Sequence, residues 1–124
     1  MIIGIGVDIE KTARFEGMTQ RFLSRVYTSN ERAYLLGKSH VSAAGLFAAK
    51  EAVAKALGTG FKGFWPSQVE VVRDGHGQPG VVLHGNAKDI ADKLAGGQGY
   101  SLKLSISHTD SDAVAFVVMH WCPI

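Results

Sequence analysis

Residues 42–57 read SAAGLFAAKEAVAKAL, and this Ala-rich stretch decides the fold. Its apolar residues recur at intervals of three and four, which is the period of an α-helix with one buried face. The members of that series are Leu46, Ala49, Val53, Ala56 and Leu57. Because glycine is favoured just after a helix, we expect the helix to end at Gly58.

The first ten residues, MIIGIGVDIE, alternate between two faces and predict a β-strand with one buried face. One face carries Ile3, Ile5, Val7 and Ile9, and the other carries Ile2, Gly4, Gly6, Asp8 and Glu10. The two glycines remove side chains beside Asp8. A ligand or another backbone could therefore approach the Asp8 carboxylate closely.

Residues 12–36 have a helical pattern that breaks near Gly17. Thr28 and Glu31 match a capping box, in which a hydroxyl and a carboxylate bond the backbone at the start of a helix. We expect the helix that follows to end at Gly37.

Three arginines, Arg14, Arg21 and Arg25, are spaced by seven and four residues within this region. They would share one helical face if Gly17 does not break the helix. Such a stripe is either a solvated basic face or a docking surface for an acidic partner protein.

The second half of the chain predicts more strands than helices. After a linker over 60–66, we expect a hairpin of strands 69–73 and 81–84, a short helix capped by Asn86 and ended by Gly96 and Gly97, and two strands over 102–108 and 113–119 joined by a turn at 109–112. No repeat or shift in composition marks a boundary. The predicted fold is therefore α+β in one domain, residues 1–124.

Composition excludes several classes of protein. The 124 residues are 46% apolar and 19% charged, with a net charge of +2, so we expect no nucleic-acid partner. Cys122 is the only cysteine, which excludes an intramolecular disulfide and a cysteine-based zinc site. Because the first residues lack a basic leader and a long apolar run, we expect a cytoplasmic protein without membrane insertion.

One stripe of the central helix carries groups suited to chemistry. Phe47, Glu51 and Lys55 are successive i, i+4 neighbours, whereas Lys50 lies on a different face. The Glu51–Lys55 pair is either a surface ion pair or part of a site with Asp8. In such a site two carboxylates hold Mg²⁺ and the lysine neutralises phosphate oxygens.

Two further motifs are compatible with phosphate or nucleotide binding. Residues 58–63 read GTGFKG, where glycines allow backbone amides to approach a phosphate and Lys62 adds a positive charge. His108 ends a strand beside a turn, as a structural histidine or as a ligand contact. The GIGVD segment lacks the third glycine of a dinucleotide-binding fingerprint, which argues against a Rossmann site.

Four segments together resemble the holo-acyl-carrier-protein synthases, the short 4′-phosphopantetheinyl transferases. They are GIGVDIEKTARFE (4–16), FLSRVYTSNE (22–31), FAAKEAVAKALGTG (47–60) and SISHTDSDAVAFVV (105–118). The resemblance spans nearly the whole chain. It implies Mg²⁺-assisted transfer of 4′-phosphopantetheine from coenzyme A to a serine of apo acyl carrier protein, releasing 3′,5′-ADP, in support of fatty acid biosynthesis. It also implies an antiparallel sheet packed against helices and a homotrimer with active sites between subunits.

The resemblance also implies residue roles. Asp8 and Glu51 are similar to the Mg²⁺ ligands of the family, and Lys55 is similar to its contact with the coenzyme A pyrophosphate. The family positions that line the coenzyme A pocket correspond to His108 and to Gly58, Thr59 and Gly60, with Lys62 beside them. Arg14 and Arg25 resemble contacts with the carrier protein, and Arg21 shares their expected face.

Two positions depart from the family pattern. The family commonly has Arg where this chain has Leu46, and often Tyr where it has Asp112, so nucleotide contacts there are expected to differ. Two alternatives to the transferase remain open: a non-catalytic module that binds coenzyme A or a nucleotide, and a structural trimer that binds neither.

Overall fold

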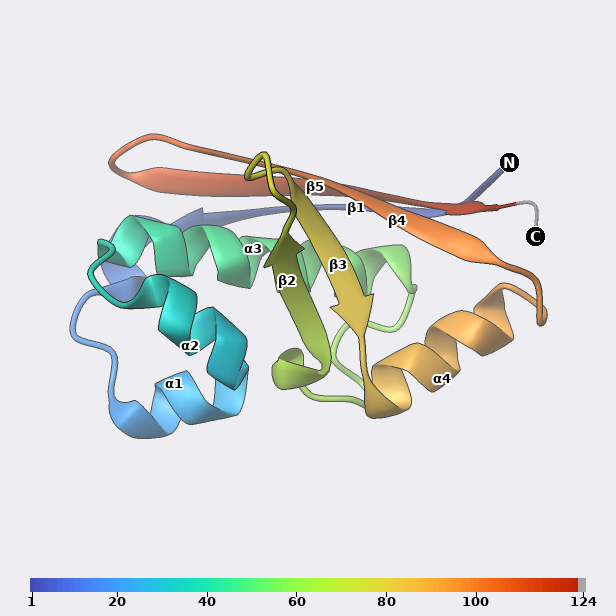
Figure 1. The fold of residues 1–124 in the computed structure, drawn as a ribbon, viewed down its shortest axis with the longest axis horizontal. Helices are drawn as coiled ribbons and strands as arrows, with labels where there is room; N and C mark the ends of the chain where they lie inside the picture. The colour runs from blue at the N-terminus through green and yellow to red at the C-terminus, as the bar shows by residue number, and fades with distance from the viewer. Residues whose placement is uncertain (123–124) are drawn as a thin grey trace.

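The computed structural model describes residues 1–122. A three-stranded and a two-stranded antiparallel sheet pack against one long helix (Figure 1). In chain order the elements are β1 (Ile2–Lys11), the 3₁₀ helix η1 (Thr12–Phe15), α1 (Gln20–Val26), α2 (Ser29–Leu35), α3 (His40–Ala56), the 3₁₀ helix η2 (Pro66–Gln68), β2 (Val69–Arg73), β3 (Pro79–Leu83), α4 (Gly85–Leu94), β4 (Tyr100–His108) and β5 (Asp112–Trp121). The larger sheet has the order β1-β5-β4, and β2 with β3 forms a separate hairpin. The predicted α+β class is confirmed.

The central helix α3 lies against the larger sheet, and it also packs against η1 and β2 (Figure 1). Ser39 caps its start by accepting a hydrogen bond from the backbone N–H of Val41. Most of its small side chains are fully buried, so the helix is the middle of the hydrophobic core. At its end Gly58 has φ +81°, as glycine at that place predicts.

The buried face of β1 is the glycine face. A Cβ at Gly4 would lie 2.0 Å from the carbonyl oxygen of Ala56, and a Cβ at Gly6 would lie 1.8 Å from that of Ala52. Strand and helix therefore meet backbone to backbone, an approach that only glycine permits. It is thus another backbone that occupies the space left by the two glycines.

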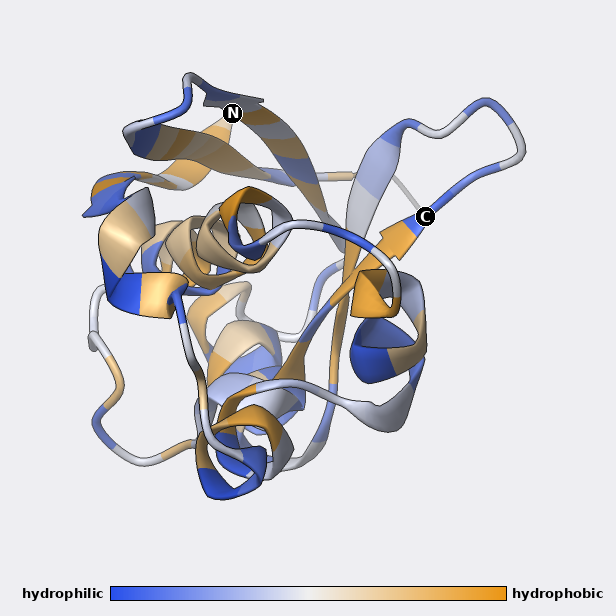
Figure 2. Cartoon of the chain, turned by 90° about the vertical axis from the view of Figure 1, so that its left-hand side faces the viewer, coloured by the Kyte–Doolittle hydropathy of each residue, from blue (hydrophilic) through white to orange (hydrophobic). Residues whose placement is uncertain are grey.

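The other face of β1 is exposed in the single chain. Ile5, Val7 and Ile9 keep 59%, 53% and 66% of their surface exposed. Their register partners on β5 extend the patch, which we call the outer apolar face: Ile5, Val7, Ile9, Val114, Phe116 and Val118. Figure 2 shows hydrophobic residues alternating with hydrophilic ones along the strands of this sheet.

The region between β1 and α3 confirms some predictions and corrects others. The capping box of Thr28 and Glu31 is present at the start of α2. Gly17 has φ +64° and separates η1 from α1. The predicted break is confirmed, so the condition for a stripe of three arginines on one helical face is not met: Arg14 lies in η1, while Arg21 and Arg25 lie in α1.

In the second half, the predicted hairpin and the final two strands are confirmed. The turn over 74–78 is held by Asp74 Oδ1, which accepts hydrogen bonds from the backbone N–H groups of His76 and Gln78 at 2.8 Å and 3.0 Å. The expected cap of α4 is wrong. Its N-cap is His84, without a side-chain hydrogen bond, and Asn86 lies inside the helix.

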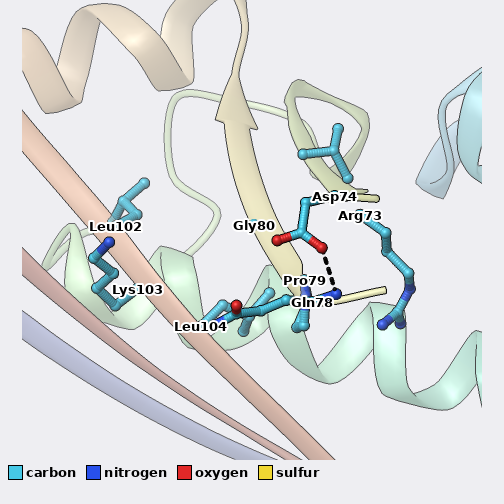
Figure 3. A pocket seen from close by; sticks show the side chains of 9 residues that line it. Arg73, Asp74, Gln78, Pro79, Gly80, Leu102, Lys103 and Leu104 are labelled. Atoms are coloured by element: carbon cyan, nitrogen blue, oxygen red, sulfur yellow. Dashed lines mark hydrogen bonds between the residues drawn. The ribbon is translucent and has the colours of Figure 1, made fainter. Parts of the chain in front are cut away.

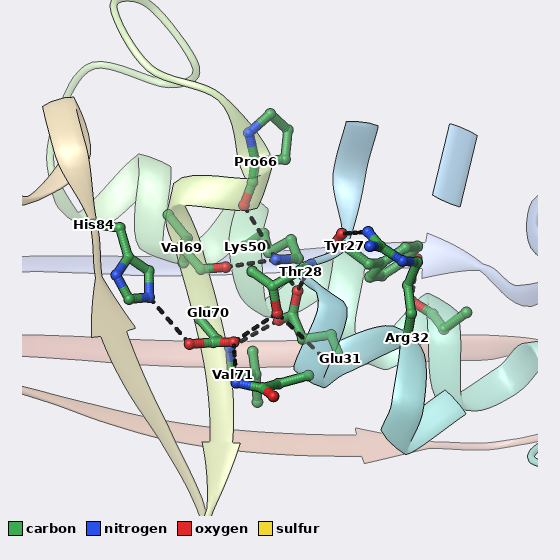
Figure 4. Close-up of polar contacts among 12 residues, drawn as sticks. Tyr27, Thr28, Glu31, Arg32, Lys50, Pro66, Val69, Glu70, Val71 and His84 are labelled. Atoms are coloured by element: carbon green, nitrogen blue, oxygen red, sulfur yellow. Dashed lines mark hydrogen bonds and ion pairs between the residues drawn. The ribbon is translucent and has the colours of Figure 1, made fainter. Parts of the chain in front are cut away.

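A buried polar network fastens α2 and β2 to α3 (Figure 4). Lys50 is 0% exposed, and its Nζ donates to Glu31 Oε1 at 2.7 Å and to the carbonyl oxygen of Pro66 at 3.1 Å. Glu31 Oε2 accepts from the backbone N–H of Val71 at 2.8 Å. Burial lowers the pKa of Lys50, and the charge of Glu31 opposes that shift. The pair therefore serves the core rather than a surface site.

No helix within residues 1–122 is both long and apolar enough to cross a membrane.

Candidate functional site

The fold brings Asp8, Glu51 and Lys55 together from two elements. Asp8 follows Gly6 on the face of β1 that meets α3, and the other two residues lie one turn apart on that helix. Lys55 Nζ donates to Asp8 Oδ1 at 3.3 Å and to the carbonyl oxygen of Val7 at 2.9 Å. The close contact between β1 and α3 thus sets the carboxylate of one element beside the ammonium of the other.

A third carboxylate, Glu10, belongs to the same cluster. It is 7% exposed and lies on the same strand face as Asp8. The pKa of Glu10 is raised to about 7, first by burial and next by the neighbouring Asp8, while the charge of Arg14 opposes both. Burial raises the pKa of Glu51 as well, with the Asp8 charge as the next cause. Carboxylates that are close together and poorly hydrated repel one another, so a bound cation would stabilise the cluster.

The donor set fits a magnesium ion. Asp8 Oδ2 is buried and has no hydrogen-bond partner among the described residues. Mg²⁺ prefers carboxylate oxygens, and proteins usually supply only one or two of them while substrate phosphates and water complete the shell. Within residues 1–122 no group of three histidine, cysteine or acidic side chains is arranged to hold a metal. Asp8 and Glu51, whose charges act on one another, are the carboxylates of the cluster that could hold such an ion.

Arg14 has a place in the cluster that its sequence position did not reveal. Its Nη1 forms an ion pair with Glu10, and its guanidinium lies 5.6 Å from the ring centre of Phe15 and 5.8 Å from that of Phe47. The i, i+4 spacing of Glu10 and Arg14 was the available signal. It was hidden because the chain passes from a strand into a 3₁₀ helix between them.

The other two predicted partner-binding residues lie apart from the cluster. Arg21 and Arg25 are both exposed on α1. They form an exposed basic pair on α1, separate from Arg14.

The glycine loop after α3 is largely occupied with ending that helix. The backbone N–H of Gly58 donates to the carbonyl oxygen of Lys55 at 2.9 Å, and that of Gly60 donates to Ala54 at 3.2 Å. Thr59 Oγ1 donates to the carbonyl oxygen of Gly60 at 2.7 Å. These two amides are used within the chain, so Lys62, which is exposed, is the member of the loop with a free charge to offer.

His108 lies at a cavity of about 250 Å³, which we call the His108 cavity. Its walls come from α2, α3, the β2–β3 hairpin and β4: Tyr34, Val41, Ser42, Gly45, Leu46, Arg73, Pro79, Ile106 and His108. Leu46, one of the two departures from the family pattern, is therefore a wall of this cavity. The other departure, Asp112, pairs with Lys11 at 3.0 Å on the opposite side of the β4–β5 turn.

Comparison with known proteins gives the class of protein. The family model of the 4′-phosphopantetheinyl transferase superfamily matches residues 4–116. The chain therefore belongs to this superfamily, and it is a 4′-phosphopantetheinyl transferase.

Individual relatives show to which group of this superfamily the chain is most similar, the holo-[acyl-carrier-protein] synthases. A holo-[acyl-carrier-protein] synthase of Clostridium perfringens is 45% identical over 125 residues, which cover 96% of this chain and 94% of the relative. The crystal structure of the Bacillus anthracis synthase has a TM-score of 0.81 at 35% identity, over 98% of this chain and 99% of that one. The Neisseria meningitidis synthase gives 0.83 at 33% identity, over 97% and 99%. The predicted family is confirmed.

Some of these structures hold ligands. The Bacillus anthracis synthase was solved in complex with CoA (3′,5′-ADP), and the Helicobacter pylori synthase, 32% identical with a TM-score of 0.79 over 94% of this chain and 99% of that one, in complex with coenzyme A.

Proposed function

We propose that this protein transfers the 4′-phosphopantetheine group of coenzyme A to a serine hydroxyl of apo acyl carrier protein, with Mg²⁺, and so supports fatty acid biosynthesis. The observation that carries the proposal is the cluster of Asp8, Glu51 and Lys55, with its unpartnered Asp8 oxygen, in a chain that matches holo-[acyl-carrier-protein] synthases over 96% of its length.

The reaction is a substitution at phosphorus. The serine oxygen forms a bond to the β-phosphorus of coenzyme A, and the bond from that phosphorus to the bridging oxygen breaks, which releases 3′,5′-ADP. A bound Mg²⁺ would offset the negative charge of the pyrophosphate oxygens. Asp8 and Glu51 would hold the ion, and the ammonium of Lys55 would contact the same oxygens.

A proton must also leave the serine hydroxyl. Glu51 is the group of this cluster suited to accept it, since burial raises its pKa above the usual value of 4.5 and makes the carboxylate a stronger base. Lys55 and Arg14 then balance the charge of the cluster, because both lower the pKa of Glu51 through their own positive charges.

The proposal includes a homotrimer. The outer apolar face exposes four large side chains, Ile5, Val7, Ile9 and Phe116, between 45% and 66%. Contiguous apolar surface of this kind marks an interface more often than free surface. Copies of this chain that meet through it would cover a sheet that nothing covers in the single chain.

The carrier protein is proposed to dock on Arg14, which lies beside the cluster, and on the separate basic pair of α1, Arg21 and Arg25. Arg21 and Arg25 on α1 present an exposed basic surface, and Arg14 lies next to the acidic residues. An acidic carrier would be steered by these charges, so docking should weaken as salt rises.

The test is the intact mass of an apo acyl carrier protein after incubation with this protein, coenzyme A and Mg²⁺. We expect a phosphopantetheine increment that disappears with EDTA and falls by about 10²-fold or more in rate with Glu51→Gln, because both remove charge stabilisation of the transition state. Glu16→Gln, an exposed carboxylate outside the cluster, is the matched control and should keep the wild-type rate.

The same experiment separates the remaining alternatives. A non-catalytic module would bind coenzyme A in a calorimetric titration without modifying the carrier. A structural trimer would bind no coenzyme A. Transfer that survives EDTA and Glu51→Gln would contradict the roles given to the cluster.

A further inference from the structure

Glu10 and Arg14 form an ion pair that joins a buried group to an exposed one. The side chain of Glu10 is 8% exposed and lies among the carboxylates of the cluster, whereas the side chain of Arg14 is 60% exposed. Among residues 1–122 Glu10 forms an ion pair with no other cation. A partner protein can therefore reach Arg14 but not Glu10.

The positive charge of Arg14 acts on the carboxylates of the cluster. Burial is the largest cause that raises the pKa of Glu10 and of Glu51, the neighbouring Asp8 raises both further, and the charge of Arg14 opposes these shifts. Arg14 is thus a counter-ion that the chain itself supplies to these carboxylates. A divalent cation bound by Asp8 and Glu51 would supply more positive charge at the same place, and it would repel the guanidinium.

The surroundings of Arg14 allow it to change its partner. Its guanidinium lies 5.6 Å from the ring centre of Phe15 and 5.8 Å from that of Phe47, and neither contact involves Glu10. Aromatic faces attract a guanidinium without using its N–H donors, of which it has five. The guanidinium can therefore stay between the two rings while a carboxylate from outside the chain replaces Glu10.

We propose that Glu10 positions Arg14 and that their ion pair makes carrier docking and Mg²⁺ binding cooperative. Each ligand compensates one member of the pair: an acidic group of the carrier pairs with Arg14, and the charge of the metal ion stabilises Glu10. The first ligand to bind breaks the pair, so the second ligand does not have to. By thermodynamic linkage the metal then tightens carrier binding by the same factor as the carrier tightens metal binding.

The proposal rests on the proposed function and adds a coupling between two of its sites. It needs no direct bond from Glu10 to the metal, since no group of three histidine, cysteine or acidic side chains within residues 1–122 is arranged to hold one. Arg21 and Arg25 form no ion pair with a described carboxylate, so they can attract an acidic carrier at all times. Arg14 joins them when the metal is bound.

The experiment measures the Kd of an acyl carrier protein by calorimetric titration at saturating coenzyme A. The titrations contain either Mg²⁺, or EDTA with NaCl at the same ionic strength, and the acceptor serine of the carrier is replaced by alanine so that no transfer occurs. We expect Mg²⁺ to lower the Kd of the wild type about fivefold to tenfold, within the usual range of coupling between two sites. In the reverse titration, the Kd for Mn²⁺, followed by the EPR signal of the free ion, should fall by a similar factor when the carrier is present.

Glu10→Gln should bind the carrier more tightly than wild type in the absence of metal, because Arg14 is then always free. Its Kd should approach that of wild type with Mg²⁺, and the metal should change it by less than about twofold. Damage to the fold would weaken binding instead, so the direction of the change separates the two explanations. Arg14→Gln, at an exposed position, should bind the carrier weakly with and without metal.

Asp74→Asn is the matched control for changing a carboxylate to an amide. Asp74 Oδ1 accepts a hydrogen bond from the backbone N–H of Gln78 at 3.0 Å in the β2–β3 turn (Figure 3). The adjoining cavity of about 370 Å³ is lined by no residue of the cluster. Asp74→Asn should therefore show the same effect of Mg²⁺ on carrier binding as the wild type.

Two results would overturn the proposal: a wild-type Kd for the carrier that Mg²⁺ does not change, or weaker carrier binding by Glu10→Gln without metal. If the metal tightens carrier binding but the protein does not modify a carrier with its serine intact, the proposed function fails and the coupling stands. If the protein modifies the carrier and the two ligands bind independently, the proposed function stands and the coupling fails.

Discussion

Gly4 and Gly6 let β1 approach α3 until backbone touches backbone. Since Asp8 follows on the same strand face, and Glu51 and Lys55 lie on the same helix, this contact sets the distance between the groups of the candidate site. The glycines touch no substrate in the proposed reaction. Their effect is to remove side-chain bulk that would push the strand carrying Asp8 away from the helix.

Gly6→Ala should therefore damage both stability and activity. Its Cβ would lie 1.8 Å from the carbonyl oxygen of Ala52, which belongs to the helix backbone and cannot turn aside. We expect a loss of about 3 kcal/mol in the free energy of unfolding, measured by urea denaturation, because overpacking forces the elements apart. Gly75→Ala, which meets no atom within 4 Å, is the control. A Gly6→Ala protein as stable as this control would show that the contact is not tight.

Residue-level prediction from the sequence reached three members of the cluster and missed two. The strand alternation and the i, i+4 stripe correctly put Asp8 on the glycine face and Glu51 near Lys55. Glu10 was assigned to the same face without a role, and Arg14 was placed with the wrong neighbours. The pairing of Glu10 with Arg14 depends on how η1 follows β1, which local periodicity does not encode.

At the scale of elements, a second polar cluster joins the hairpin to α2. Glu70 on β2 accepts hydrogen bonds from Thr28 Oγ1 at 2.6 Å and from Asn30 Nδ2 at 3.3 Å, and it contacts His84 Nε2 at 3.0 Å (Figure 4). The bond from Thr28 is the largest cause that lowers the pKa of Glu70, and those of His84 and Asn30 add to it. These contacts favour the ionised carboxylate in the folded chain.

Glu70 should therefore make the free energy of unfolding depend on pH in the acidic range. A pKa below its usual 4.5 in the folded state contributes stability that is fully present above that value and is lost as the pH falls through the folded pKa. Glu70→Gln should unfold about 1–3 kcal/mol more easily at pH 7, because hydrogen bonds to a charged group are lost. The difference from wild type should shrink below pH 4.5.

The measurement is urea denaturation of both proteins between neutral and acidic pH. Asp89→Asn removes an exposed carboxylate on α4 and serves as the control for loss of one charge. A difference between wild type and Glu70→Gln that stays constant across the whole range would contradict the assignment.

Elements with a strong local signal were predicted well, and so was the capping box of α2, whereas the cap of α4 was not. The Ala-rich period identified α3, and the Asp-Gly and Gly-Gln-Pro residues of 74–79 identified the hairpin turn. Asn86 fits a cap by residue type, yet the helix starts two residues earlier than that cap implies, at Gly85, whose φ of +54° turns the chain after β3. Side-chain preference at a helix start is weaker than the geometry that the preceding strand imposes.

At the scale of the whole molecule, the sequence does not show which face of β1 is buried. The alternation of residues shows that the two faces differ, and apolar content alone would predict that the isoleucine face is the buried one. In the single chain the glycine face is the one that packs on α3. The isoleucine side stays exposed in the single chain. The pattern within one strand does not distinguish an exposed apolar face of this kind from a face that packs in the core.

Oligomer formation can be tested on the outer apolar face itself. Val7 lies at its centre, opposite Phe116, and a lysine there would place a charge between large apolar side chains of neighbouring copies. Wild type should sediment with a mass three times 13.3 kDa, whereas Val7→Lys should shift toward the mass of one chain. Val82→Lys, at a site 41% exposed on the hairpin, is the matched control and should remain a trimer.

The same pair of variants decides whether assembly is needed for transfer. If the active site is completed by a neighbouring copy, Val7→Lys should lose transferase activity at low protein concentration, and part of it should return as the concentration rises by mass action. Val82→Lys should behave as wild type throughout. An active Val7→Lys monomer would contradict the shared site, and an inactive trimer would show that the substitution acts through the neighbouring Asp8 instead.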